Sequence, residues 1–405
     1  MHETRATVLA ALLVVAAVAA IPTGAATVGS NADGVESLQE TTEDCELPYT
    51  ATDATGTEVT VEERPERIVT LGPGGAQTLV ELEADDRIVG ATQYASYLEG
   101  SDGWENVSGP GRTFASVEKV VAQQPDLVLA ENIVPNETVE QLRSAGIRVY
   151  KFRAATGLGD VYDKVNRTGR LVDEPYAAAE TVGEMQYEVR IARRAAEGQE
   201  SPQSLYVFFG YTTGQGTFID EIITAAGGTN VAAEAGITGY KQISPEVVAN
   251  RTVEWLLLNS DGPTVPQSEA YQGTIAVRQN QTVVLDANYV SQPAPRIVEP
   301  IATLSKAFYP DAYEEAASQV EEPSDVRPAC APPETTTETT TGDVVTTTVA
   351  DEDGSTTVFD DATTSLSFDE ATTTPAGTDG GAPGFTPILA VLAIIGALVL
   401  LNRRR

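Results

Sequence analysis

The first part of the chain alternates between short apolar runs and amphipathic segments. Residues 49–61 alternate in polarity around Thr55-Gly56, which is typical of a β-hairpin. Runs rich in β-branched residues then predict buried strands at residues 67–71, 87–92, 126–130 and 147–152. Amphipathic segments predict a helix that runs through Leu82 and further helices at residues 117–122 and 137–144. This alternation indicates a mostly parallel sheet that is covered on both faces.

The middle of the chain has a helical pattern and no strand pattern, from residue 160 to about residue 196. Apolar residues recur there at spacings of four and three, at Ala178, Val182, Met185, Val189 and Ala192. Pro175 suits the first turn of this helix, or a kink after a preceding helix. A helix over residues 175–196 would be ~33 Å long. It is either an ordinary surface helix or a rigid strut between two lobes.

The strand and helix alternation then restarts. Strands are predicted at residues 205–209, 253–259 and 282–286, with helices at 218–226, from Ser244 onward and at 296–308. The predicted fold is therefore α/β, with two Rossmann-like lobes of mostly parallel sheet joined by a long rigid helix. The predicted boundaries are an N-terminal lobe at 45–156, a linking helix at 157–199 and a C-terminal lobe at 200–330.

Both ends of the chain are typical of an exported protein. Residues 1–26 have a basic residue, an apolar run of 14 residues and then small residues, which predicts a secretory signal peptide. Residues 331–382 are dense in Thr, Asp, Glu, Gly and Pro, so we expect a disordered stalk that cannot form a core.

Residues 383–405 are predicted to attach the protein to the membrane. An apolar stretch of 17 residues, 385–401, precedes three arginines, which favours a membrane segment with a cytoplasmic tail. It begins at Pro383-Gly384-Phe385, which resembles the PGF C-terminal sorting signal of archaeal surface proteins. The resemblance implies that the segment is processed and replaced by a lipid anchor. A plain transmembrane anchor is the alternative, and either places the protein on the outer face of the cytoplasmic membrane.

Charge and histidine content exclude several classes of function. The chain has 25 Lys and Arg against 59 Asp and Glu, a net charge of -34, which opposes binding to nucleic acid phosphates. This bias resembles the composition of proteins from salt-loving archaea. The one histidine, His2, lies in the predicted signal peptide, so the mature chain has no imidazole for a Ser-His-Asp or Cys-His nucleophile or for a metal site. We expect no resident cofactor and no metal site; a metal would arrive chelated or be held by oxygen ligands.

Two cysteines flank the patterned region. Cys45 and Cys330 would both lie outside the cell, where disulfides persist, so we interpret them as one bridge between its two ends. Two free thiols are the alternative. Five Asn-x-Ser/Thr sequons also suit a surface glycoprotein, although we expect some to be unused. They are at Asn106, Asn136, Asn166, Asn250 and Asn280.

The order of several short motifs resembles the helical-backbone class of ABC-transporter binding proteins, which includes vitamin B12-binding and ferric siderophore-binding proteins. The likeness covers residues 48–315. It is carried in the first half by residues 65–73, 89–94, 125–130 and 137–149, and in the second by residues 206–210, 226–231, 243–248 and 294–296. The resemblance implies a ligand cleft between the lobes, at the carboxyl ends of the strands.

On that basis we expect the ligand contacts to come from loops on both lobes. The candidates are Gly74, Gln77, Tyr94, Tyr97, Tyr211, Tyr240, Tyr289 and Arg296. Tyrosines suit a planar chelate through stacking and hydrogen bonding, and Arg153 or Arg296 would pair with an anionic group. Half-buried packing is the alternative for each tyrosine, and a structural ion pair is the alternative for Arg296. The loop at residues 72–75 lacks the Gly-Lys-Ser/Thr of a phosphate loop, so it either lets the backbone approach the ligand or turns the chain.

The resemblance also implies docking on a permease through one acidic residue in each lobe. The matching positions are Glu137 and Glu246, each in the predicted first turn of a helix. Charge complementarity at a helix end is the alternative explanation for both. A glycan on Asn136 would obstruct Glu137, so we expect that sequon to be unused.

The predicted function is that of an extracellular solute-binding receptor, not an enzyme. It would bind a metal chelate, such as a corrinoid or a ferric siderophore, and deliver it as a monomer to the permease and ATPase subunits of an ABC importer. A surface hydrolase using carboxylates and a structural or adhesive surface protein are the alternatives.

Overall fold

The computed structural model describes residues 45–109, 115–324 and 326–331. Within these ranges the α/β class with parallel sheets is confirmed. The predicted signal peptide, stalk and sorting signal lie outside the described residues. No helix in the described part of the chain is long and apolar enough to cross a membrane.

A β-hairpin opens the described chain, as predicted. Strands β1 (Tyr49–Thr52) and β2 (Glu58–Val61) pair antiparallel, with Tyr49 opposite Val61. Alternate residues of both strands are buried. The period-two pattern in the sequence therefore reports a hairpin that buries one face.

The first sheet has five strands in the order β5-β4-β3-β6-β7, and all neighbours are parallel. The strands are β3 (Ile68–Leu71), β4 (Ile88–Ala91), β5 (Glu105–Asn106), β6 (Leu127–Ala130) and β7 (Val149–Lys151). The connecting helices are α1 (Pro73–Glu81), α2 (Val117–Ala122) and α3 (Asn136–Ser144), with short 3-10 turns η1 (Asp85–Arg87), η2 (Gln93–Ala95) and η3 (Ser101–Gly103). Every residue of the central strands β3 and β6 is buried, which explains their unbroken apolar runs.

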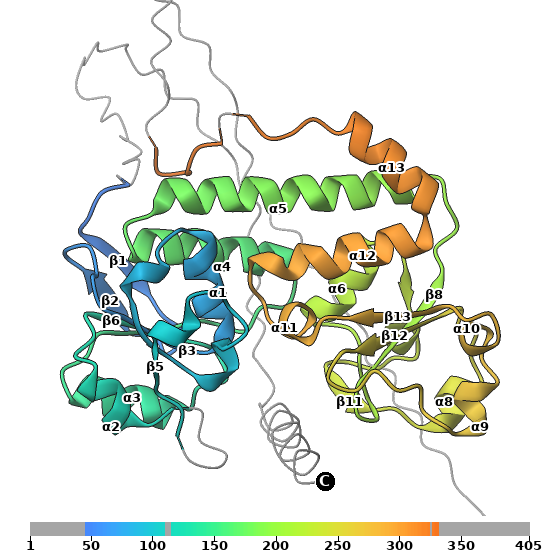
Figure 1. The fold of residues 1–405 in the computed structure, drawn as a ribbon, viewed down its shortest axis with the longest axis horizontal. Coiled ribbons are helices and arrows are strands. Elements are labelled where there is room, and N and C mark those ends of the chain that lie inside the picture. Colours follow the sequence, from blue (N-terminus) through green and yellow to red (C-terminus); the bar gives the residue numbers. More distant parts are fainter. Residues whose placement is uncertain (1–44, 110–114, 325, 332–405) are drawn as a thin grey trace, which may run out of the picture. The chain divides into compact units, whose positions relative to one another are not determined.

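The linking segment contains two helices. Helix α4 (Leu158–Leu171) is followed by α5 (Pro175–Ala196), and Pro175 is the first residue of α5. Pro175 therefore lies in the first turn of a separate helix, which is the first of the two interpretations, and not at a kink. Glu174 has φ -129 and ψ 52, outside the α region, as the residue before a proline prefers. Figure 1 shows α5 running alongside α4 and then alongside α12 (Val298–Phe308).

The second sheet has four parallel strands in the order β10-β8-β12-β13. These are β8 (Gln203–Val207), β10 (Thr229–Asn230), β12 (Trp255–Asn259) and β13 (Thr282–Leu285), and a separate antiparallel pair joins β9 (Tyr211–Thr213) to β11 (Tyr240–Gln242). The helices of this half are α6 (Phe218–Ala225), α7 (Val231–Glu234), α8 (Pro245–Ala249), α9 (Glu269–Gln272), α10 (Ile275–Arg278), α11 (Ala287–Val290), η4 (Pro295–Ile297), α12 and α13 (Pro310–Gln319). Strands β9 and β11 and the four-residue helices were not predicted from the sequence, because three or four residues show too little periodicity. The longer helix α13 was not predicted either.

After α13 the chain runs back along α5 (Figure 1). We call the described part of this segment, residues 320–324 and 326–331, the strap. Val326 of the strap lies over Gly183 in α5, where an added Cβ would be 2.8 Å from the Val326 Cγ2 atom. The strap ends at the predicted disulfide, since Cys330 is bonded to Cys45. The second half of the chain is thus joined to the first by α5 and again by a covalent bond.

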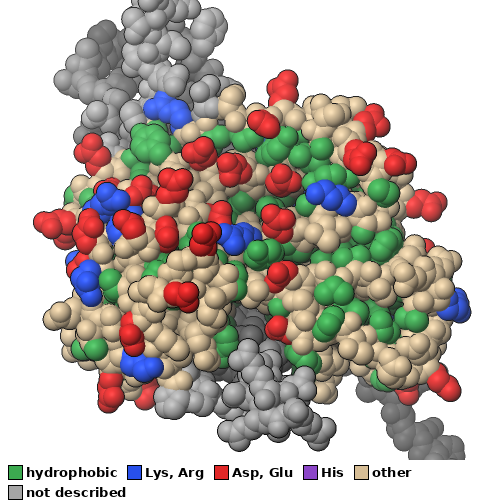
Figure 2. All heavy atoms as spheres, viewed as in Figure 1, with side chains coloured by type: hydrophobic (Ala, Val, Ile, Leu, Met, Phe, Trp, Pro, Cys, Tyr) green, Lys and Arg blue, Asp and Glu red, His purple; other side chains and the backbone are tan. Residues whose placement is uncertain are grey.

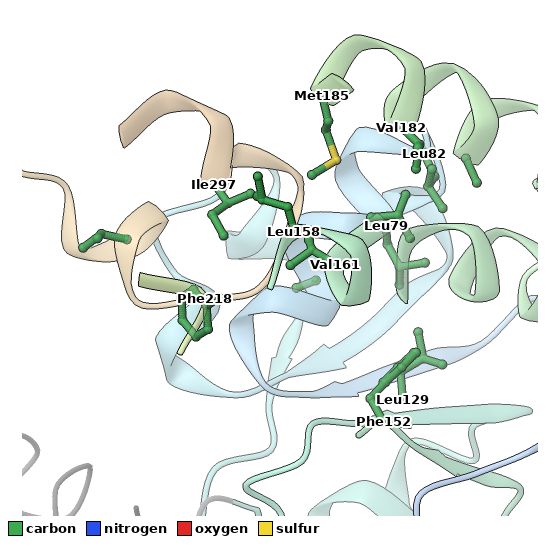
Figure 3. Close-up of a cluster of buried hydrophobic side chains, with 14 of the residues drawn as sticks. Leu79, Leu82, Leu129, Phe152, Leu158, Val161, Val182, Met185, Phe218 and Ile297 are labelled. Atoms are coloured by element: carbon green, nitrogen blue, oxygen red, sulfur yellow. The ribbon is translucent and has the colours of Figure 1, made fainter. Parts of the chain in front are cut away.

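The parts of the fold built around the first and the second sheet are called the first half and the second half below. One buried apolar cluster continues through both halves. It includes Leu79 and Leu129 of the first half, Leu158 and Met185 of the linking helices, and Phe218 of the second half (Figure 3). Smaller clusters lie on the outer face of each sheet. The two sheets are therefore separate, but they share a core through α4 and α5.

Candidate functional site

The carboxyl ends of both sheets lead into the residues that were expected to contact a ligand. Strands β3 and β4 lead to α1 and to Tyr97, while β8 and β13 lead to Tyr211 and Tyr289. Because all neighbouring strands in each sheet are parallel, these ends gather at one edge of the sheet. Figure 2 shows the two halves in the view of Figure 1, with acidic side chains spread widely over the described surface.

Tyr97 and Tyr289 bring the two halves together. Their ring centroids are 6.4 Å apart in an edge-on arrangement. The Tyr97 hydroxyl accepts a hydrogen bond of 2.7 Å from Gln77 Nε2 and donates one of 3.4 Å to Gln292 Oε1. Burial raises the pKa of Tyr97 to about 12, although the hydrogen bond from Gln77 acts against it. The phenol is therefore neutral at physiological pH and serves as a hydrogen-bonding group.

Gln77 and Arg296 are engaged with protein groups. The backbone N–H of Arg296 donates to Gln77 Oε1 over 2.9 Å, and Arg296 Nε donates to Glu81 Oε1 over 2.7 Å. Burial acts to lower the pKa of Arg296, but the hydrogen bond and charge of Glu81 outweigh it and the pKa is raised. The guanidinium also lies 5.9 Å from the Tyr289 ring centroid. The structural ion pair, one of the two interpretations of Arg296, is thus present.

The glycines at residues 72–75 make room for a neighbouring side chain. Gly72 has φ 152, and a Cβ there would be 2.1 Å from Glu131 Cγ. A Cβ on Gly74 would be 3.0 Å from Glu131 Oε1 and 3.3 Å from Lys164 Nζ. Gly74 is buried. The positive φ of Gly72 at the start of α1 fits the interpretation that this loop turns the chain, and the structure adds close packing of Gly72 and Gly74 on Glu131.

Three aromatic residues of the second half form what we call the aromatic cluster: Phe208, Tyr211 and Tyr240. The ring of Phe208 lies 6.0 Å from Tyr211 and 6.2 Å from Tyr240. Both tyrosines are half-buried, and burial raises the pKa of Tyr240. Two further candidates, Tyr94 and Arg153, are exposed and lie outside this cluster and outside the Tyr97–Tyr289 contact.

Glu131 and Lys164 were not predicted from the sequence. They are 33 positions apart, so no local motif joins them. A weak signal was available, because the chain has only five lysines and two of them, Lys151 and Lys164, are buried. A buried lysine needs a partner, so a rare lysine on an otherwise apolar helix face indicates one.

The two acidic residues that were expected to dock on a permease are both exposed. Glu137 lies in the first turn of α3 and Glu246 in the first turn of α8. Glu246 borders a surface depression of about 310 Å³ that Asn250 and Arg251 also line. The side-chain oxygen of Asn136 accepts a hydrogen bond from Lys151 Nζ, so this part of the sequon is engaged within the protein.

A comparison of the sequence with protein families identifies the family of this chain. The sequence profile of the family described as Periplasmic binding protein matches residues 68–289, more than half of the chain. The chain belongs to the periplasmic binding protein family. This confirms the resemblance that the motifs indicated.

Individual relatives agree with that membership. A cobalamin-binding protein of Halobacterium salinarum is 39% identical over 277 residues, which cover 65% of this chain and 75% of that protein. A vitamin B12-binding protein of Salmonella choleraesuis is 26% identical over 239 residues, covering 57% and 86%. Among solved structures, the apo form of the periplasmic heme-binding protein RhuT from Roseiflexus sp. RS-1 has a TM-score of 0.56 and 28% identity, covering 61% of this chain and 99% of that one.

These findings make the chain a substrate-binding receptor of the periplasmic binding protein family. Its relatives are binding proteins and not enzymes. The surface hydrolase and the adhesive protein, which were the alternatives from the sequence, are set aside by the family match.

Proposed function

We propose that this receptor binds a metal chelate outside the cell, a corrinoid in the first place, and delivers it to an ABC importer. The observation that carries the proposal is the 39% identity to a protein named for cobalamin binding, over 65% of this chain and 75% of that protein. A ferric siderophore is the second candidate chelate. Other relatives are named for heme or molybdate, so the experiment has to include those ligands.

The contacts between the halves suit a large, flat ligand with polar edges. Tyr97 and Tyr289 meet edge-on, and the aromatic cluster lies on the second half. Aromatic rings bury a large area at low cost in side-chain entropy, while their hydroxyls hydrogen-bond to amide or carboxylate edges. Arg153, which is exposed, would pair with an anionic group of the ligand, whereas Arg296 would act through Glu81 and Tyr289.

A binding panel tests the ligand class. Cyanocobalamin at a hundred times its dissociation constant should stabilise the protein by about 2.7 kcal/mol, because ligand bound only to the folded state adds its binding free energy to folding. Calorimetry and thermal unfolding at high salt, with haem, a ferric hydroxamate and molybdate in parallel, would measure it. If none of the three chelates raised the melting temperature, or if molybdate alone did, the proposed ligand class would be wrong.

A tyrosine variant tests the place of binding. Tyr289→Ala should weaken binding of the ligand about tenfold, since it removes one of the two aromatic rings that meet between the halves. Tyr176→Ala is the matched control, because Tyr176 is 53% exposed on α5 and takes no part in the Tyr97–Tyr289 contact. Equal affinity of both variants for the ligand would place the site elsewhere.

The proposal includes attachment and docking. The apolar segment at residues 385–401 would tether the receptor to the outer face of the cytoplasmic membrane, with residues 331–382 as a stalk. Glu137 and Glu246 would each pair with a basic residue of the permease. The two lie in different halves, so they would fix the receptor as a monomer across both permease subunits.

Docking has a direct test. Glu137→Ala combined with Glu246→Ala should weaken the interaction of loaded receptor with its permease–ATPase complex about tenfold, with ligand affinity unchanged. Ligand uptake into vesicles that contain the importer measures it. Glu314→Ala on α13, also an exposed acidic residue, is the control. Unchanged uptake with the double variant would contradict the docking assignment.

A further inference from the structure

A buried ion pair lies where the two halves meet. Lys164 Nζ is 2.8 Å from both carboxylate oxygens of Glu131. The two side chains are only 5% and 8% exposed. Lys164 belongs to α4, and Glu131 directly follows β6 of the first sheet.

The same ammonium group also reaches the second half. Lys164 Nζ donates a hydrogen bond of 3.1 Å to the carbonyl oxygen of Pro293, between α11 and η4. A Cβ on Gly74 would lie 3.5 Å from Ala294 Cβ, so this segment packs directly over the glycine that accommodates the ion pair. One ammonium group, carried by α4, thus donates hydrogen bonds both to the residue that follows β6 of the first sheet and to the second half.

The segment that Lys164 holds is bonded to the first half at further points. We call residues 292–296 the junction segment. Its bonds are from Tyr97 Oη to Gln292 Oε1, from the Arg296 N–H to Gln77 Oε1, and from Arg296 Nε to Glu81 Oε1. Lys164 and Glu131 are the most deeply buried charged groups among these contacts.

Burial of charge is weak evidence for stability, because desolvation offsets much of the attraction between the two groups. Apolar residues of similar volume would serve stability as well. What an apolar contact lacks is direction. An ammonium group that must meet two carboxylate oxygens and one carbonyl fixes the distance and angle between the three elements that carry them.

We propose that Glu131 and Lys164 are positioning residues for ligand binding, which hold the junction segment so that Tyr289 and Tyr97 face each other in a preformed site. The proposal rests on the proposed function, in that the site between the halves binds the ligand. Tyr289 is three residues before the junction segment, in α11, so displacement of that segment moves Tyr289 relative to Tyr97. Preorganisation of this kind lowers the ordering cost of binding.

The test compares two ion pairs. Lys164→Met removes the charge at the junction and keeps most of the stem. Arg143→Met removes a charge from the Asp53–Arg143 pair, which lies entirely within the first half. Spin labels at Glu140 on α3 and Glu269 on α9, both exposed, report the distance between the halves in the full folded domain.

Both variants should lower the melting temperature. Only Lys164→Met should broaden the distribution of distances between the labels and weaken binding of cyanocobalamin by about fivefold. Glu131→Gln, which keeps the shape and an acceptor, should give an intermediate broadening and serves if Lys164→Met fails to fold. An intermediate result from Glu131→Gln is not expected of a role in stability alone.

Two results would overturn the proposal. One is a distance distribution that is the same in wild type, Lys164→Met and Glu131→Gln. The other is equal broadening in Arg143→Met and Lys164→Met. If the distances broaden as expected but no chelate binds to the wild type, the geometric role of the pair stands, while the ligand assignment and the role in ligand binding fail together.

Discussion

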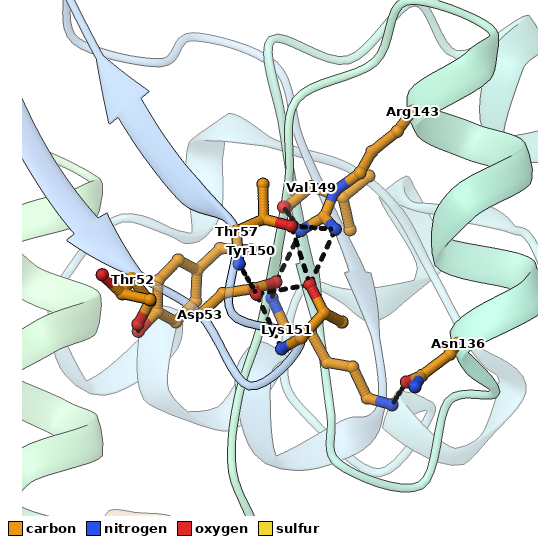
Figure 4. Close-up of polar contacts among 9 residues, drawn as sticks. Thr52, Asp53, Thr57, Asn136, Arg143, Val149, Tyr150 and Lys151 are labelled. Atoms are coloured by element: carbon orange, nitrogen blue, oxygen red, sulfur yellow. Dashed lines mark hydrogen bonds and ion pairs between the residues drawn. The ribbon is translucent and has the colours of Figure 1, made fainter.

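Replacement of Asp53 by asparagine is expected to lower the free energy of unfolding by about 3 kcal/mol at pH 7. The Asp53 side chain is fully buried and pairs with Arg143 at 2.5 Å. It also accepts hydrogen bonds from Thr55 and from the backbone N–H groups of Thr57 and Lys151 (Figure 4). One carboxylate thus joins the turn of the β1–β2 hairpin to α3 and β7, and asparagine would leave the arginine without its counter-charge.

The loss should depend on pH in a defined direction. Burial acts to raise the pKa of Asp53, but the hydrogen bonds from Thr55, Lys151 and Arg143 outweigh it, so the pKa is lowered. A carboxyl group with a lowered folded-state pKa contributes stability above its unfolded pKa, about 3.9, and loses it as the pH falls through the folded value. The difference between wild type and variant should therefore be constant from about pH 7 to pH 5 and shrink below about pH 4.

Urea unfolding at fixed salt across this pH range measures both effects. Asp102→Asn is the control, because Asp102 is exposed in η3 and its replacement should change the free energy of unfolding by no more than about 0.5 kcal/mol. A difference that persisted undiminished at the lowest pH would show that the charge of Asp53 is not the source of the stability.

Joint replacement of Cys45 and Cys330 by serine is expected to lower the free energy of unfolding by about 4 kcal/mol. The bond closes a loop with a sequence separation of 285, so it restricts the unfolded chain strongly. In the folded protein it also holds the strap along α5. Loss of the bond should free the strap without changing ligand affinity, since the strap lies on α5 and is separate from the junction segment and from the Tyr97–Tyr289 contact.

Gly183 gives this prediction a second measurement. Glycine inside a helix costs about 1 kcal/mol relative to alanine, but alanine at this position would collide with Val326. Gly183→Ala should therefore destabilise the protein while the disulfide is intact, by about 1 to 2 kcal/mol. In the Cys45→Ser and Cys330→Ser background the strap can move away, so the cost of Gly183→Ala should fall or change sign.

A helix glycine in open space provides the control. Gly159 in α4 has no atom within 4 Å of an added Cβ, so Gly159→Ala should stabilise slightly in both backgrounds. Urea unfolding of the six proteins, with and without the disulfide, completes the test. If Gly183→Ala had the same effect in both backgrounds, the disulfide would not be what presses the strap against α5.

Local patterns predicted most of the longer elements well. Helix α2 was predicted at the residues where it lies, and the hairpin and the central strands were placed within two residues. These elements bury whole strands or one helix face, so burial leaves a periodic trace in the sequence. The disulfide was also predicted, from two cysteines placed at the ends of the patterned region.

The candidate site was harder to predict. The carboxyl ends of the strands suggested Tyr97 and Tyr289 as ligand contacts, and the structure brings these two rings together. The role of Gly74 and the partner of Arg296 were not visible, because both depend on residues far away in the chain. The ligand contacts themselves stay predictions.

The sequence by itself determined the α/β class, the family and the order of the main strands and helices, because periodicity and motif order depend on neighbouring residues. Only the tertiary structure decided that Glu131 meets Lys164, that Glu81 holds Arg296 and that Val326 covers Gly183. Each of these pairs joins segments that are remote in the chain. The pattern of apolar and polar positions in the sequence indicates which residues are buried. The residue that each buried group contacts is fixed by the packing of whole helices and strands.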